Sequence, residues 1–289
     1  MTETKPIADY RAELGEGPAY DPATGTLYWF DIVESKLLEK RMPDGELVVH
    51  DLPFMASALA VIDPARQLLV TEHGLYVREK ATGKLTLHVG VEDNNEITRS
   101  NDARVHPGGS LWFSTMAKDE RSGAGAIYWY RHGEVRLLFP SITIPNSICF
   151  APDGSCAYFT DTQTNMLKRV TCDPLTGLPT GEPQLFYAHR GDGGLDGSVM
   201  DADGILWNAR WGGSCVDAYA PDGTLVRTVP VPARQPSCPV FIGKNAQHMA
   251  VTSAWKGLGE AEKAADPEAG RTFLLNVEVN GRFDPPVAF

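Results

Sequence analysis

Six positions of this chain stand five residues before a recurring turn pattern, and four of them carry carboxylates or amides. In chain order the six residues are Glu16, Ala58, Asn101, Asn146, Asp196 and Ser237. Carboxylate and amide oxygens form a hard donor set, which suits Ca²⁺, Mg²⁺, Mn²⁺ or Fe²⁺ better than copper or a structural zinc. Two carboxylates brought to one place would repel each other, and a cation would remove that cost. The set predicts a divalent-metal site; the alternative is that these side chains cap strands or hydrogen-bond to one another.

The turn pattern itself recurs six times at nearly constant spacing. It begins at Asp21, Asp63, His106, Ala151, Asp201 and Ile242, at intervals of 42, 43, 45, 50 and 41 residues. Its Pro-Asp-Gly and Pro-Gly-Gly sequences favour a tight turn, because proline pre-sets φ and glycine accepts a positive φ. A repeat of about 40–50 residues with apolar, strand-like flanks is typical of a four-stranded β-propeller blade. The sequence therefore predicts an all-β chain: one domain over residues 1–289, folded as a six-bladed β-propeller with four antiparallel strands per blade around a central channel.

Further strands are expected inside these intervals. They lie at 75–78 and 85–88, 126–130 and 135–139, and 215–219 and 226–229. The apolar segment 272–279 should meet the N-terminal segment to close the ring, and the polar stretch 256–271 should be a connection with one helical turn. A β-sandwich would not repeat at one period across six units, and the Gly-His and Trp-Asp signature of WD40 blades is missing.

Two more polar residues are expected near the aligned positions. Arg99 stands two residues before Asn101, and Asp119 follows the apolar segment 111–116, which should return it to the same end of the propeller. Both can hydrogen-bond a polyhydroxylated ligand. The alternative is a surface ion pair between Arg99 and Asp119.

Composition and charge narrow the class of protein. A net charge of −11 argues against nucleic acid or an anionic membrane as a partner. Five cysteines without C-x-x-C spacing imply neither a structural zinc nor a disulfide framework. The N-terminus lacks an apolar signal region, and no run of 18 apolar residues occurs. We expect a cytoplasmic monomer that acts on a small molecule.

Seven short segments, in order along the chain, resemble the SMP-30/gluconolactonase/regucalcin family. They are Leu14–Pro18, Arg99–Asp102, Ser114–Met116, Ile144–Ser147, Gly194–Gly197, Ser237–Cys238 and Val251–Ala254. The resemblance implies a six-bladed propeller that holds one divalent metal and hydrolyses sugar lactones. By it, Glu16, Asn146 and Asp196 correspond to metal ligands, and Asp196 also to the general base. Arg99, Asn101 and Asp119 correspond to substrate-contacting positions, although the family often has Glu in place of Asp119.

Within the family the chain resembles bacterial pentonolactonases such as xylonolactonases, and the resemblance favours Fe²⁺, with Ca²⁺, Mn²⁺ or Zn²⁺ as alternatives. The expected reaction is hydrolysis of D-xylonolactone, or of L-arabinono- or D-gluconolactone, to the aldonic acid. Two other functions remain open at this point: a paraoxonase-like hydrolase of other lactones or phosphotriesters, and a non-catalytic propeller that binds Ca²⁺ or a metabolite.

Overall fold

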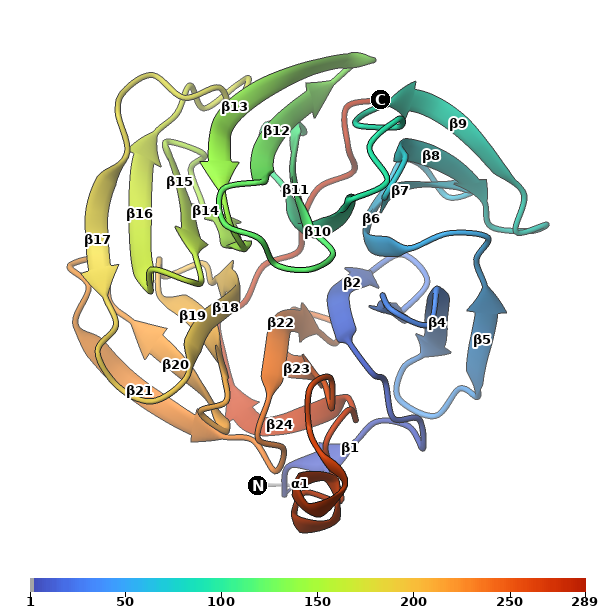
Figure 1. Ribbon diagram of the computed structural model, residues 1–289, viewed down its shortest axis with the longest axis vertical. Helices are drawn as coiled ribbons and strands as arrows, with labels where there is room; N and C mark the ends of the chain where they lie inside the picture. The colour runs from blue at the N-terminus through green and yellow to red at the C-terminus, as the bar shows by residue number, and fades with distance from the viewer. Residues whose placement is uncertain (1–2) are drawn as a thin grey trace. The chain divides into compact units, whose positions relative to one another are not determined.

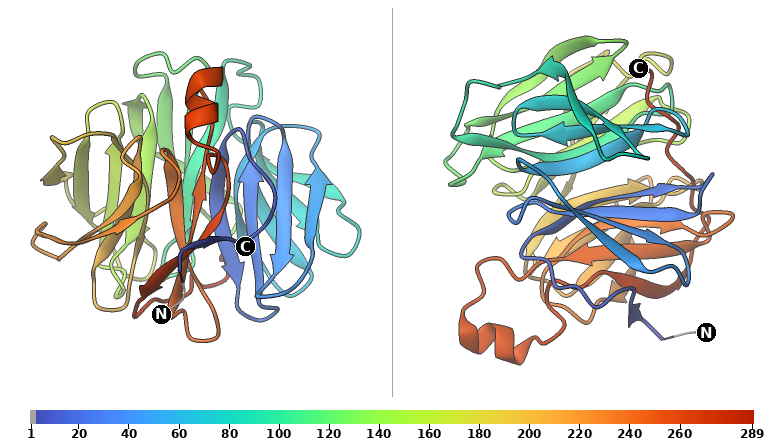
Figure 2. Two further views of the ribbon diagram at one scale, coloured as in Figure 1. Left: turned by 90° about the horizontal axis from the view of Figure 1, so that it is seen from below. Right: turned by 90° about the vertical axis from the view of Figure 1, so that its right-hand side faces the viewer.

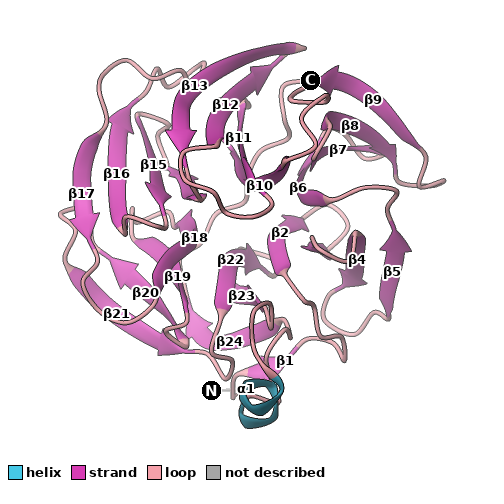
Figure 3. Cartoon of the chain, in the orientation of Figure 1, coloured by secondary structure: helices cyan, strands magenta, loops and turns pink. Residues whose placement is uncertain are grey.

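The regular secondary structure of the chain consists almost entirely of β-strands. In the computed structural model, which describes residues 3–289, there are 24 strands and one short helix. The strands form six four-stranded antiparallel sheets, each of which is one blade (Figures 1 and 3). The predicted fold class, a six-bladed β-propeller, is confirmed.

The blades fall into two compact units of three. The first unit, up to Pro53 and over His189–Phe283, has the blades β2–β5, β18–β21 and β22–β24 with β1. Their bounds are β2 (Gly15–Asp21), β3 (Thr26–Asp31), β4 (Lys36–Arg41), β5 (Leu47–Asp51), β18 (Gly194–Met200), β19 (Leu206–Trp211), β20 (Cys215–Tyr219), β21 (Leu225–Pro230), β22 (Pro236–Ile242), β23 (His248–Ser253), β24 (Phe273–Glu278) and β1 (Lys5–Pro6).

The second unit spans Phe54–Ala188 and Asp284–Phe289. Its strands are β6 (Ala56–Val61), β7 (Arg66–Thr71), β8 (Gly74–Glu79), β9 (Leu85–Gly90), β10 (Thr98–Val105), β11 (Leu111–Ala117), β12 (Gly125–Arg131), β13 (Glu134–Ile142), β14 (Pro145–Phe150), β15 (Cys156–Asp161), β16 (Met166–Thr171) and β17 (Gln184–Ala188). The C-terminal segment of this unit joins two of its blades, because Val287 N–H donates to Val61 and Ala288 N–H donates to Gly109. The single domain over residues 1–289 stays a prediction.

The recurring turn joins the first and second strands of a blade, as its sequence predicts. The N–H groups of Gly109, Gly154 and Gly204 donate back to the residues that open their turns, at 2.7, 2.9 and 3.2 Å. All three glycines have a positive φ, which side-chain-bearing residues rarely adopt. The turn chemistry read from the sequence is thus the chemistry that closes these hairpins.

Apolar side chains between neighbouring blades of a unit form the core. In the first unit Val199 and Trp207 pack in one cluster with Phe241, Met249 and Val251 of the next blade. Burial falls from the first strands to the fourth, so that β14 is buried throughout and β5 is largely exposed. In the blade β2–β5 the fourth strand is the most exposed, whereas the second strand, β3, is more fully buried than β2. Within residues 3–289, no helix has the length and apolar character needed to cross a membrane.

The two chain-end predictions are confirmed. β24 pairs with β1 through Lys5 opposite Leu274 and Pro6 opposite Phe273, so the N-terminal segment supplies the outer strand of the last blade. The connection from β23 to β24 carries the only helix of the described residues, α1 (Glu260–Ala265). Figure 2 shows α1 standing out from the strands of its unit.

One blade of the first unit contains a buried ion pair. Arg210 on β19 and Asp217 on β20 form it diagonally across the strand pair, with both Nε and Nη2 of Arg210 at 3.1 Å from Oδ2 of Asp217. Thr228 donates to Oδ1 of Asp217 at 2.6 Å, and Arg210 also bonds to Tyr219. Each charge depends on the other, because an unpaired charge in the interior is costly.

Replacing Asp217 should therefore destabilise the protein strongly. Asp217→Ala leaves the Arg210 guanidinium buried without its partner, and we expect the free energy of unfolding in urea to fall by about 3–5 kcal/mol. Glu134→Ala is the control, since it breaks an ion pair with Arg136 in which both side chains are about half exposed, 53% and 49%. The control should leave the urea midpoint unchanged within error; equal effects of the two variants would contradict the argument.

Candidate functional site

The predicted site positions coincide with a break in strand register. In every blade the pairing of the first strand with the second is interrupted within one residue of the aligned position. Pairing skips Gly17 and Pro18 after Glu16, for example, and it skips Asp196 and Gly197 after Leu195. Such a β-bulge re-aims side chains and ends regular pairing, and bulges are common beside functional sites. The sequence located these positions but gave no sign of the bulge.

Two of the bulges share a backbone conformation. Gly17, directly after Glu16, has φ of 53°, and Ser147, directly after Asn146, has φ of 60°. A left-handed residue at this point is easy for glycine and costs a serine roughly 1 kcal/mol or more. The same backbone turn therefore presents a predicted metal ligand in each unit.

A carboxylate fixes the entry to both of these strands. Asp31, at the end of β3, accepts the N–H groups of Glu13 and Leu14 at 2.9 and 3.1 Å. Asp161, at the end of β15, likewise accepts the N–H groups of Thr143 and Ile144 at 2.9 and 3.0 Å. Glu13 and Leu14 stand three and two positions before Glu16, and Thr143 and Ile144 stand three and two positions before Asn146. The backbone that carries Glu16 and Asn146 is thus anchored from the neighbouring strand.

In the first unit, Glu16 lies on β2 and Asp196 on β18, and both strands pack against β22. Asp196 is 4% exposed, and Glu16 is half-buried with its Oε2 accepting the N–H of Gly17 at 3.0 Å. On β22, the buried Ser237 donates to the carbonyl of Gly15 and bonds to Thr252 at 2.8 Å. Ser237 therefore ties β22 to the strand that carries Glu16.

The bulge that bears Asp196 is held by a side chain that the sequence did not single out. Nδ2 of Asn208, on β19, donates to the carbonyls of Asp196 and Gly197 at 2.8 and 3.3 Å and lies 3.0 Å from Oγ of Ser198. Gly197 faces Cys238, where an added Cβ would come within 2.4 Å of the sulfur. The available signal for Asn208 was a polar residue between the apolar Trp207 and Ala209.

In the second unit, three predicted residues meet in one hydrogen-bonded chain. Arg99 Nη1 donates to Oδ1 of Asn101 at 2.8 Å, and Nδ2 of Asn101 donates to Oδ1 of Asn146 at 2.8 Å. All three are buried, with exposed fractions of 5%, 8% and 5%. Ala58, at the same repeat position, is buried and adds no polar group. Two of the six aligned positions, Asn101 and Asn146, therefore hydrogen-bond to each other, as the alternative to a metal site predicts.

Asp119 lies at the same end of its blade as Arg99 but is engaged elsewhere. Thr98 pairs with Ala117, so the turn that follows β11 lies where β10 begins. The Asp119 side chain is 56% exposed, and Arg121 donates to both of its oxygens, at 2.7–3.0 Å. This contact holds the pKa of Asp119 below its usual range. Its ion-pair partner is thus Arg121, whereas the alternative named Arg99.

The donor chemistry of the predicted ligands fits a hard divalent cation. Glu16 and Asp196 supply carboxylates. The hydrogen bonds around Asn146 orient its amide so that Oδ1 faces Asn101 and Nδ2 faces Thr162. Among residues 3–289, no group of three or more His, Cys, Asp and Glu side chains could hold a metal. A site in this chain would accordingly combine two carboxylates with an amide, and an open coordination shell is typical of catalytic metals.

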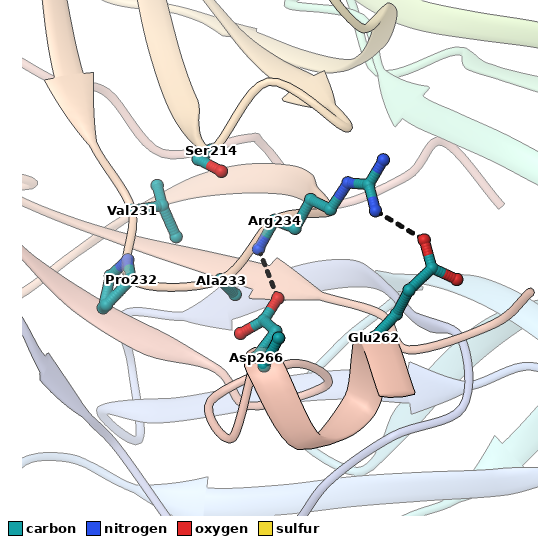
Figure 4. A pocket seen from close by; sticks show the side chains of 8 residues that line it. Ser214, Val231, Pro232, Ala233, Arg234, Glu262 and Asp266 are labelled. Carbon is teal, nitrogen blue, oxygen red and sulfur yellow. Dashed lines mark hydrogen bonds and ion pairs between the residues drawn. The ribbon is translucent and has the colours of Figure 1, made fainter. Parts of the chain in front are cut away.

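A separate pocket of about 470 Å³ lies beside α1 and contains none of the predicted residues (Figure 4). Ser214, Val231 and the segment 232–234 line one side, and Glu262 and Asp266 line the other. Arg234 spans it, with its guanidinium 2.7 Å from Glu262 and its N–H donating to Asp266 at 2.7 Å. The pocket lining thus carries one positive and two negative charges, and both carboxylates contact Arg234.

Residues 14–255 match the family model described as the SMP-30/Gluconolactonase/LRE-like region. The chain belongs to this family. A protein of Rhizobium meliloti (strain 1021) assigned as a sugar lactone lactonase is 51% identical over 96% of this chain and 95% of its own length. The L-arabinolactonase of Azospirillum brasilense is 36% identical over 95% of this chain and 92% of its own. The crystal structure of a calcium-binding protein, regucalcin, from Agrobacterium tumefaciens str. C58 has a TM-score of 0.96 at 48% identity, covering 98% of this chain and 96% of that one.

This SMP-30/gluconolactonase-like chain also buries an acid beside the Arg99–Asn101 pair. Asp102 accepts the N–H of Ile148 at 2.7 Å, and Ser114 donates to its carbonyl at 2.8 Å. Burial raises the pKa of Asp102 to about 6, although Arg104 and the backbone N–H groups oppose the rise. The folded state thus binds the proton more tightly than the unfolded chain, where an aspartate has a pKa of about 3.9. Ionisation of Asp102 consequently costs stability as the pH rises from about 4 through 6.

Removing this charge should stabilise the protein at neutral pH. Asparagine can accept the same Ile148 N–H, so in the metal-free protein Asp102→Asn should raise the free energy of unfolding at pH 7.5 by about 1–3 kcal/mol. The gain should vanish near pH 4, where Asp102 itself is protonated. Asp153→Asn is the control, because its exposed carboxylate has a pKa lowered by Ser155 and should give no gain. A gain independent of pH would refute the buried-charge explanation.

Proposed function

We propose that this chain hydrolyses a sugar lactone to the aldonic acid with one divalent metal ion. D-Xylonolactone is the favoured substrate, followed by L-arabinono- and D-gluconolactone. The activity is supported by relatives named as a sugar lactone lactonase and an L-arabinolactonase, which align with nearly the whole chain. The observation that carries the proposal is one repeat position, at a register break in the first strands, that holds Glu16, Asn146 and Asp196.

Glu16, Asn146 and Asp196 would hold the cation, with Fe²⁺ favoured over Ca²⁺, Mn²⁺ and Zn²⁺. When bound, the cation supplies Lewis-acid polarisation of the lactone carbonyl and stabilises negative charge in the transition state. A solved relative described as a calcium-binding protein supports a divalent ion in this fold.

The remaining steps belong to side chains. Asp196 accepts a proton from the attacking water as the water oxygen bonds to the carbonyl carbon and the C=O π pair moves to the carbonyl oxygen. When that pair returns, the ring C–O bond breaks and the ring oxygen takes up the proton from Asp196. The product acid then releases one proton to solvent. Arg99 and Asn101 position the lactone through its hydroxyls, and such positioning lowers the entropic part of the barrier. Arg99, Asn101 and Asp196 are all buried. Their burial supports this arrangement, because a hydrogen bond is stronger where water is excluded.

A metal-binding propeller without turnover is the second candidate. It is favoured by the same description of a 48%-identical solved relative as a calcium-binding protein, a description that names no reaction. Turnover of a lactone separates the two candidates, because both include the cation.

Metal removal is the first test. Proton release from D-xylono-, L-arabinono-, D-glucono- and long-chain acyl lactones should be fast only for sugar lactones, and EDTA should lower that rate roughly 100-fold or more, because polarisation by the cation contributes several kcal/mol. One of the four named cations should restore the rate. Unchanged turnover in EDTA would exclude the metal, and absence of turnover with every cation would leave the binding propeller.

Asp196 gives the second test. Asp196→Ala removes a ligand and the proton acceptor together, so kcat/KM for the sugar lactone should fall roughly 1,000-fold or more. The circular dichroism spectrum should be unchanged. Asp222→Ala, in an exposed turn of the same blade, is the matched control and should keep the wild-type rate. If Asp196→Ala kept most of its activity, the assigned site would be wrong.

A further inference from the structure

The hydrogen-bonded chain in the second unit continues beyond Asn146 to a threonine. Nδ2 of Asn146 donates to Oγ1 of Thr162 at 2.9 Å. The complete order is Arg99, Asn101, Asn146 and Thr162, drawn from β10, from β14 and from the turn after β15. Every link in it is a side-chain bond of 2.8 or 2.9 Å.

The direction of this chain is set at its first member. A guanidinium has only donors, so the group of Asn101 that meets Arg99 must be its oxygen. The amide nitrogen of Asn101 then faces Asn146 and donates both to its Oδ1 and to the carbonyl of Pro145, the latter at 2.9 Å. Asn146 must therefore turn its oxygen toward Asn101 and its nitrogen away.

At the far end of the hydrogen-bonded chain, the Thr162 hydroxyl accepts the hydrogen bond from the Asn146 amide nitrogen. The N–H of Thr162 donates to the carbonyl of Ile144 at 2.9 Å, and its neighbour Asp161 accepts the N–H groups of Thr143 and Ile144. The segment 161–162 thus holds both the backbone before Asn146 and the amide of Asn146 itself. Without the hydroxyl, the amide nitrogen of Asn146 would lose this bond, and the amide would be held at the Asn101 end alone.

We propose that Thr162 is a positioning residue for the metal ligand Asn146. The inference deepens the proposed function and rests on it: Asn101 sets which way the amide faces, and Thr162 holds the amide at its other end, so that Oδ1 stays fixed on the ligand side. A carbonyl oxygen has two lone pairs, and the bond from Asn101 uses one of them. The other is free to bind a cation, which an amide nitrogen cannot do. Partners of this kind are worth about 10–100-fold in metal affinity.

The test measures binding of Mn²⁺ alone to EDTA-stripped protein by isothermal titration calorimetry. Thr162→Val replaces the hydroxyl with a methyl group, and Thr162→Ala removes it without adding bulk; both should weaken Mn²⁺ binding by about 10–100-fold. Thr162→Ser keeps the hydroxyl and should bind within about threefold of wild type. Thr164→Val, in the same turn, is the matched control, because the Thr164 hydroxyl donates only to the carbonyl of Asp161. It should bind Mn²⁺ as wild type does.

The outcomes are distinct. Wild-type Mn²⁺ affinity in Thr162→Val and Thr162→Ala would overturn the positioning role while leaving the proposed function intact. An equal loss in Thr162→Ser, or in Thr164→Val, would also overturn it, since the defect would then follow the turn rather than the hydroxyl. If the unaltered protein turned over sugar lactones without binding any divalent cation, the metal assignment itself would fail and the role of Thr162 with it. The metal-free variants should remain folded, with cooperative unfolding in urea.

Discussion

In each blade the hydrogen-bond ladder between the first and second strands breaks near the same place, and the candidate site depends on this break. A regular strand alternates its side chains between two faces, each of which packs against a neighbouring blade. Two residues opposite one disturb that alternation and leave backbone groups free for other partners. At or beside the breaks lie Glu16, Asn101, Asn146 and Asp196 on the first strands of their blades.

Polar side chains hydrogen-bond the backbone groups that these breaks leave unpaired in the interior. Buried backbone groups need hydrogen bonds, and here side chains of the second strands or of the turns after them provide several: Ser114 for the carbonyl of Asp102, Asn208 for that of Asp196, and Thr252 for the backbone of Cys238. Asp31 and Asp161 do the same for the strand entries. The scaffold therefore stabilises an irregular backbone with bonds from the blade that carries it and, in the case of Asp102 and Ile148, from the neighbouring blade.

The direction of donors matters as much as their number. Arg99 can only donate, and this single fact orders the amides of Asn101 and Asn146. This row of hydrogen-bonded side chains resembles the residues around other protein metal sites that orient the metal ligands without touching the ion. In the proposed function, Arg99 and Asn101 would therefore both orient a metal ligand and bind a sugar.

By itself the sequence determined the number of blades, the turns, the strand pairs of the intervals, the closing strand and the position that bears the polar residues, because these follow from local turn chemistry and from a repeat that persists along the chain. The family segments added the expected chemistry. Only the tertiary structure decided the bulges, the left-handed Ser147, the pairing of Asp119 with Arg121, and the parts played by Asn208 and Thr162. The physical reason is that the parts played by Asn208 and Thr162 depend on contacts between strands and turns, and a hydrogen-bond partner 12 or 16 residues away leaves no periodic mark on the sequence.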